Sequence, residues 1–262
     1  MRSELYDVFI ILQGFKKYLL NKEELLQITD ISDREELFRR LKKMFFMTQD
    51  VKGKTGLSEY FGSILSEYIN KINVFLKTSG LGLDMRDITD FKTRGNDIKD
   101  LLNSFGKLQR AVRLLEGIKW AGRELFYEWW DLLLTIFLFR IRNSYGIREV
   151  LPDSLGTGTL KADYSLIRRV IFEGEDIKRL SGEFPRFAEA FGSNDPSGIF
   201  ERARRIFYTY LIQKSIVFDF DDIPSIIFSR LFLFIRQSEI VLASVNCLEL
   251  GIERKKLYDF II

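Results

Sequence analysis

Apolar residues recur with helical periodicity along most of this chain, and no other feature constrains the fold as strongly. In the stretch from Leu57 to Leu76, apolar side chains return every three or four residues over about five helical turns. The stretches 98–118 and 200–211 repeat the pattern. Such spacing places the apolar side chains on one face of an α-helix. We therefore expect an all-α fold, with the alternating stretch 216–220 as an extended connector.

Several residue types mark where these helices begin and end. All four prolines lie at or beyond Pro152, which leaves the earlier chain free to form long helices. Stretch 50–56 is interpreted as a loop and 152–159 as a linker. Two helix starts combine a capping residue with a proline in the first turn. They are Asn194 or Asp195 before Pro196, and Asp221 or Asp222 before Pro224.

Three places share one local pattern, in which a long apolar helix is followed at once by a short charged helix. The long helices are expected at Tyr6–Leu20, Trp129–Asn143 and Ile226–Leu250. Each precedes a residue suited to a left-handed helix end, and these residues are Asn21, Gly146 and Gly251. The spacing indicates a degenerate repeat of about 100 residues.

Composition excludes much catalytic chemistry. The chain has no histidine and a single cysteine, Cys247. This rules out a Ser-His-Asp triad, a Cys-His pair, a histidine zinc site and an internal disulfide. Carboxylate chemistry and a phosphate-binding loop remain open. The net charge of +3 is too balanced to indicate nucleic-acid binding.

Two motifs resemble fragments of chemical sites. Gly53-Lys54-Thr55 matches the end of a phosphate-binding loop, but Thr48 stands where its first glycine belongs and a basic helix precedes it. We interpret it as a solvated loop. Asp219, Asp221 and Asp222 could ligate Mg²⁺, yet capping of the following helix is the simpler interpretation. We expect no catalytic residue, cofactor or metal.

Two basic clusters are candidates for contact with an acidic partner. The first spans 39–43 at the end of a predicted helix, where cations favour the helix dipole. The second contains Arg202, Arg204 and Arg205 on the solvated flank of an amphipathic helix. We select the second cluster as the candidate partner contact.

Membrane insertion is not expected. The longest apolar runs, 8–15, 132–139 and 240–248, reach about half of the roughly 20 residues that a spanning helix needs. Glu4 places an acid where a signal peptide would begin its apolar segment. We therefore expect a cytosolic protein.

The middle and the end of the chain carry a pattern typical of one family. A long helix with an acid and then an arginine is followed by a glycine step with another acid. The residues are Trp130, Asp131, Arg140, Gly146 and Glu149 in the middle, and Glu239 and Gly251 near the end. This arrangement resembles the C subunit of archaeal and bacterial vacuolar-type (V-type, A/V-type) ATP synthases, the homologue of the d subunit of the vacuolar ATPase. The chain is shorter than members of that family usually are.

The resemblance implies a funnel of three similar helical bundles, which we place at 1–120, 121–192 and 193–262. It implies a non-catalytic central-stalk subunit on the cytoplasmic face of the membrane. Its partners would be shaft subunits D and F and the proteolipid rotor ring, and its role would be coupling ATP synthesis or hydrolysis to proton or sodium transport.

Two alternatives stay open. One is a cytosolic helical scaffold or adaptor that binds a partner helix or peptide in a groove. The other is an enzyme that uses Asp219, Asp221 and Asp222 with a metal ion.

Overall fold

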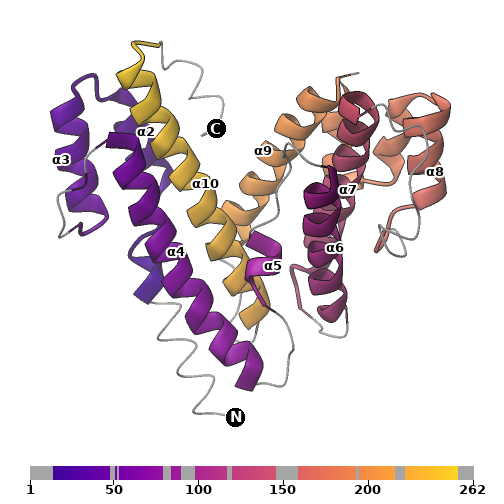
Figure 1. The fold of residues 1–262 in the computed structure, drawn as a ribbon, viewed down its shortest axis with the longest axis horizontal. Helices are drawn as coiled ribbons and strands as arrows, with labels where there is room; N and C mark the ends of the chain where they lie inside the picture. The colour runs from indigo at the N-terminus through magenta and orange to yellow at the C-terminus, as the bar shows by residue number, and fades with distance from the viewer. Residues whose placement is uncertain are drawn as a thin grey trace. The chain divides into compact units, whose positions relative to one another are not determined.

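The computed structural model is mainly helical in the part of the chain that it describes. The described residues are 14–47, 51, 53–78, 84–89, 98–116, 120–145, 159–192, 195–215 and 222–252. No strand occurs within these ranges, which confirms the all-α prediction (Figure 1). None of the described helices is long and apolar enough to cross a bilayer. The chain forms two compact units, one from residues 1–75 with 211–262 and the other from 76–210. The three-bundle division stays a prediction.

The first unit is built on two long helices and two short ones. The long ones are α4 (Gly53–Thr78, most of which lies in this unit) and α10 (Ile223–Glu249); the short ones are α2 (Lys22–Asp30) and α3 (Arg34–Met44). Helix α10 packs against α2 and α3. Most of the apolar stripe of α4 is buried, and Tyr60 and Leu65 are half-buried. An aromatic cluster forms part of the core, and its members are Phe15, Phe45, Phe61, Tyr68 and Phe234.

A buried glutamine fixes the chain before α2 in this unit. Gln237 lies on α10 and is 2% exposed. Its Oε1 accepts the backbone N–H of Leu20 at 2.8 Å, and its Nε2 donates to the backbone carbonyl of Tyr18. One side-chain amide thus satisfies a donor and an acceptor of a non-helical segment, which would otherwise lack partners in the interior.

The first expected helix ends differently from the prediction. Residues 1–13 lie outside the described part, and helical geometry covers only 14–16, with a turn at 17–18 in place of a helix to Leu20. Asn21 is not a left-handed helix end, because its φ is −80° and its ψ is 173°. Asn21 instead begins α2 with a reciprocal capping box, in which Glu24 Oε2 accepts the N–H of Asn21 at 2.8 Å and Asn21 Oδ1 accepts the N–H of Glu24 at 2.9 Å.

The second unit is built around one largely buried helix, α7 (Arg123–Tyr145). Its other elements are α5 (Arg86–Thr89), α6 (Ile98–Leu114), α8 (Tyr164–Arg168), the π-turn η2 (Arg169–Glu173), the 3₁₀ helices η3 (Ile177–Gly182) and η4 (Pro185–Gly192), and most of α9 (Pro196–Ser215). The side chains of 132–139 are buried except for half-buried Leu133, close to the prediction for this stretch. Trp129 stacks on Phe207 with ring centres 4.4 Å apart.

Three of the predicted helix boundaries are confirmed. Asp195 caps α9 by accepting the N–H of Gly198 at 2.9 Å, and Pro196 is the first helical residue. Asp222 caps α10 through the N–H of Ser225 at 3.4 Å. Gly251, at φ +64°, ends α10 in a Schellman motif, in which the N–H of Ile252 donates to the carbonyl of Cys247 at 2.8 Å. Gly146 lies outside the described residues, although α7 reaches Tyr145 as expected.

Candidate functional site

A stripe of acidic residues runs along one side of the first half of α7. Glu124, Glu128 and Asp131 occupy positions i, i+4 and i+7, a spacing that places them on the same helix face. This face meets the segment before α8 and the start of η4 through the hydrogen bonds described below. Glu128 and Asp131 are the buried charged residues in the described part of the second unit, and Glu124 is half-buried.

Asp131 holds the backbone of the segment before α8. Its side chain is 2% exposed, and its two oxygens accept the backbone N–H groups of Leu160, Lys161 and Ala162, each at 2.8 Å. Burial raises the pKa of Asp131, and the three N–H bonds oppose that rise by stabilising the carboxylate. The carboxylate therefore caps the backbone at residues 160–162 and holds this segment against α7.

Glu128 binds two cations from other segments. Its side chain is 1% exposed; Oε1 accepts from the Arg186 guanidinium and from Lys161 Nζ at 3.3 Å, and Oε2 accepts the backbone N–H of Arg186 at 3.2 Å. A buried carboxylate is tolerated only when it is paired and hydrogen-bonded in this way. Glu128 thus fixes η4 against α7.

Lys161 bridges two carboxylates of the stripe. Its Nζ lies 2.7 Å from Glu124 Oε2 in addition to its contact with Glu128. The hydrogen bond from Lys161 holds the pKa of Glu124 below its ordinary value. The same bond to Glu124 raises the pKa of Lys161. Both groups are therefore stabilised in their charged forms.

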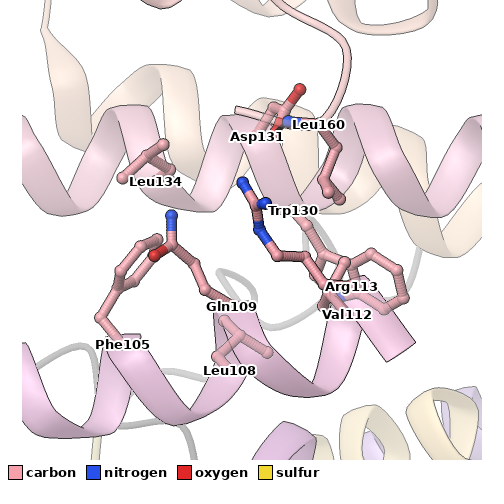
Figure 2. Close-up of a pocket in the computed structure, with 9 residues that line it drawn as sticks. All are labelled: Phe105, Leu108, Gln109, Val112, Arg113, Trp130, Asp131, Leu134 and Leu160. Carbon is pink, nitrogen blue, oxygen red and sulfur yellow. Dashed lines mark hydrogen bonds between the residues drawn. The ribbon is translucent and has the colours of Figure 1, made fainter. Parts of the chain in front are cut away.

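A small pocket lies beside this stripe, between α6 and α7 (Figure 2). Its volume is about 20 Å³, enough for roughly one water molecule. Figure 2 shows the Arg113 guanidinium and the Gln109 amide projecting from α6 toward α7, with Phe105 beside Gln109. Asp131 also lines the pocket, but both its oxygens already accept backbone donors. The pocket fits a structural water better than a substrate.

A larger open groove lies in the first unit. Its volume is about 240 Å³, and its lining residues are Gly14, Phe15, Lys17, Tyr18, Ile64, Glu67, Tyr68 and Lys71. Glu67 and Lys71 form an ion pair at 2.5 Å on α4. Burial raises the pKa of Tyr68 far above its ordinary value.

The residues that carry the family resemblance have mainly structural surroundings. Trp130 and Asp131 are buried on α7 and both line the small pocket. Arg140, also on α7, lies over the ring of Phe200 with 5.4 Å to the ring centre. In the other unit, Glu239 lies 3.4 Å from Arg236, and Gly251 ends α10. Gly146 and Glu149 lie outside the described residues.

The three arginines selected as a partner contact are not equivalent. Arg202 and Arg205 are exposed on α9. Arg204 is half-buried, since its guanidinium lies 5.9 Å from the centre of the Phe200 ring and 3.9 Å from Glu201. Only Arg202 and Arg205 therefore project freely enough to meet another molecule.

The other two candidate motifs, Gly53-Lys54-Thr55 and the acidic cluster at 219–222, have structural roles where the structure describes them. Gly53-Lys54-Thr55 forms the first turn of α4 and not a loop, and Lys54 Nζ donates to Asn246 Oδ1 at 3.3 Å. Asp222 caps α10, whereas Asp219 and Asp221 lie outside the described residues. Among the described residues no group of acidic, cysteine or histidine side chains is arranged to hold a metal.

Sequence reasoning missed the roles of Glu128, Lys161 and Arg186. A signal was present, because Glu128 and Asp131 flank two tryptophans, and acids that are buried among apolar residues require partners. Those partners lie up to 58 residues away along the chain, so local patterns did not identify them. In this all-helical protein, the buried carboxylates of the site therefore bind the backbone and side chains of the same chain. No family model, characterised protein or solved structure matches the chain.

Proposed function

We propose that this chain is a non-catalytic helical subunit that binds protein partners. The observation that supports this most directly is the state of the buried carboxylates. Asp131 and Glu128 accept hydrogen bonds from their own chain, and Asp131 has both oxygens occupied by backbone donors. A general acid or base needs a face open to the substrate. These carboxylates instead join α7 to its neighbours.

The concrete form of the proposal is the central-stalk C subunit of a vacuolar-type rotary ATPase. It rests on the sequence resemblance around Asp131, Arg140 and Gly251. A coupling component transmits torque only if its body is stiff, and densely packed interiors are nearly incompressible. The stacked rings of Trp129 and Phe207 and of Phe105 and Phe137, with centres 4.4 and 4.8 Å apart, fit that requirement. The partners would be shaft subunits D and F and the proteolipid ring.

The exposed face of α9 is the proposed contact for a partner. Arg202 and Arg205 are three residues apart and both point to solvent. Their guanidinium groups present planar donors that match carboxylates, a common feature of protein interfaces. An acidic surface on a shaft subunit would be complementary to them.

The test is purification of the tagged chain from native membranes, followed by identification of the proteins that accompany it. We expect ATPase shaft and ring subunits to co-purify. Reversing charge with Arg202→Glu and Arg205→Glu should release the shaft subunits. The matched control is Arg110→Glu with Arg168→Glu, which reverses two exposed arginines elsewhere in the same unit. Absence of every ATPase subunit from the purified material would overturn the rotary role, and nucleotide hydrolysis by the isolated chain would overturn the non-catalytic one.

A further inference from the structure

The turn after α3 contains a strained and exposed aromatic residue. Phe46 has φ +54°, and it is the only non-glycine residue with positive φ in the described part of the chain. The turn is a Schellman motif, in which the N–H of Met47 donates to the carbonyl of Lys42 at 3.0 Å. Glycine is the usual residue at this position, because a side chain there is strained. The Phe46 ring is nonetheless 60% exposed, so it contributes little to the core.

Several lysines lie close to Phe46 in space or in sequence. Lys42 and Lys43 occupy the last turn of α3 just before it, and Lys17 Nζ lies 5.8 Å from the ring centre. Lys17 also lies over Tyr18, at 4.8 Å, and Lys16 is its neighbour in the chain. We call these six residues the Phe46 surface; they are Lys16, Lys17, Tyr18, Lys42, Lys43 and Phe46.

The lysines of the Phe46 surface are exposed, and none forms an ion pair within the described part of the chain. The arginines earlier on the same helix differ, because Arg39 and Arg40 both pair with Glu36. The surface therefore combines uncompensated positive charge with a projecting apolar ring. Lys42 and Lys43 favour the dipole at the end of α3, but the exposed Phe46 ring adds little to the core, and strain retained at an exposed position points to function.

We propose that the Phe46 surface docks on an anionic phospholipid surface. The lysines bind headgroup phosphates, and the Phe46 ring inserts among the headgroups and upper acyl chains. This inference is independent of the rotary role proposed above, since it concerns a direct contact with lipid.

The choice of lipid over an acidic protein follows from the residue types. Lysine is a flexible point charge that suits mobile phosphates, whereas protein interfaces favour the planar arginine fork and are depleted in lysine. The ring also stands out from the end of a helix and does not lie in a pocket, a shape that suits insertion into a soft surface.

The test is sedimentation of the full chain with phospholipid vesicles. Vesicles containing about one-third phosphatidylserine should bind the protein at low salt, and pure phosphatidylcholine vesicles should bind it far more weakly. Binding should weaken as salt rises. Replacing Lys17, Lys42 and Lys43 together by Gln should reduce affinity on the order of a hundredfold, or about fivefold per lysine. The matched control replaces exposed Lys77, Lys107 and Lys178 by Gln and should retain most of the binding.

Two changes at Phe46 separate binding from folding. Phe46→Gly removes the ring and the backbone strain together, so vesicle affinity should fall about tenfold while stability is kept or raised. Phe46→Trp should shift its fluorescence emission to shorter wavelength on anionic vesicles, because the new indole enters the apolar layer.

Three results would overturn the proposal: no binding to anionic vesicles at low salt, equal loss of binding in the lysine control, or an unchanged emission wavelength of the Phe46→Trp variant on anionic vesicles. Binding to polyglutamate but not to vesicles would instead identify an acidic protein as the partner. None of these outcomes depends on whether ATPase subunits co-purify with the chain.

Discussion

Asn in place of Asp131 is expected to destabilise the second unit strongly, although the two side chains have nearly the same shape. The Asp131 carboxylate accepts three backbone N–H groups, from Leu160, Lys161 and Ala162, each at 2.8 Å. An Asn side chain keeps one acceptor oxygen and replaces the other with a donor. With the oxygen toward Lys161 and Ala162, its NH₂ group faces the N–H of Leu160, and two donors meet.

The magnitude follows from these bonds. A hydrogen bond to a charged group contributes roughly 1.5–3 kcal/mol, and a buried donor left without a partner costs roughly 1–3 kcal/mol. Asp131→Asn loses one such bond and the charge that strengthens the other two. We therefore expect a loss of about 2–4 kcal/mol, a large share of the roughly 5–15 kcal/mol that stabilises an ordinary domain.

Tryptophan fluorescence during urea unfolding measures this loss directly. All three tryptophans of the chain, Trp120, Trp129 and Trp130, belong to the second unit. The matched control is Asp176→Asn, because exposed Asp176 caps η3 by accepting the N–H of Lys178 at 3.0 Å. Asn caps helices as well as Asp does, so this variant should stay within about 0.5 kcal/mol of wild type. A loss at Asp131 no larger than at Asp176 would refute the reasoning.

Three further predictions follow from single contacts. Gly251→Ala should lower the free energy of unfolding by about 1 kcal/mol, because φ of Gly251 is +64°. Gly62→Ala, on the exposed face of α4, should raise it by about 0.5–1 kcal/mol. The urea midpoints of the two variants should therefore move in opposite directions. Lys161→Gln should raise the pKa of Glu124 toward its ordinary value, which NMR titration measures. In wild type, the lowered pKa contributes folding stability at pH values above the ordinary Glu pKa. This contribution is lost as the pH falls through the pKa of the folded state. Phe207→Ala should cost about 3–5 kcal/mol in thermal unfolding, because the ring is fully buried.

The helices and several of their ends could be predicted because their signals are local. The stripe of α4 spans one continuous stretch, and Asp195, Asp222 and Gly251 act within three or four residues of their own positions. Asn21 shows the limit of such signals, since asparagine suits both a left-handed helix end and a helix start. Glu24, three residues later, distinguishes the two, because it completes a capping box.

The stretch 164–192 could not be predicted in the same way. It consists of short α, π and 3₁₀ turns, which periodicity does not specify. Contacts distant in sequence hold these turns, such as the bond from Arg142 to the carbonyl of Ile171 and the bond from the N–H of Asp163 to Glu183 at 2.7 Å. Phe46 likewise gave no signal, because the left-handed turn after α3 lacks the glycine that usually marks it.

Because Asp131 is hydrogen-bonded to the backbone of its own chain, residues with a binding function should be sought elsewhere. Asp131 holds the backbone of residues 160–162 against α7. Its position in the family-like pattern therefore reflects the fold and does not by itself identify a reactive group. A residue of that kind specifies how segments meet, and its loss would disturb any function without revealing which one. Residues that meet other molecules must instead be exposed, and a role in binding is easiest to test where they are dispensable for folding. Arg202, Arg205 and Phe46 satisfy the first condition, and the Phe46→Gly variant tests the second, because it should bind lipid less while folding at least as well.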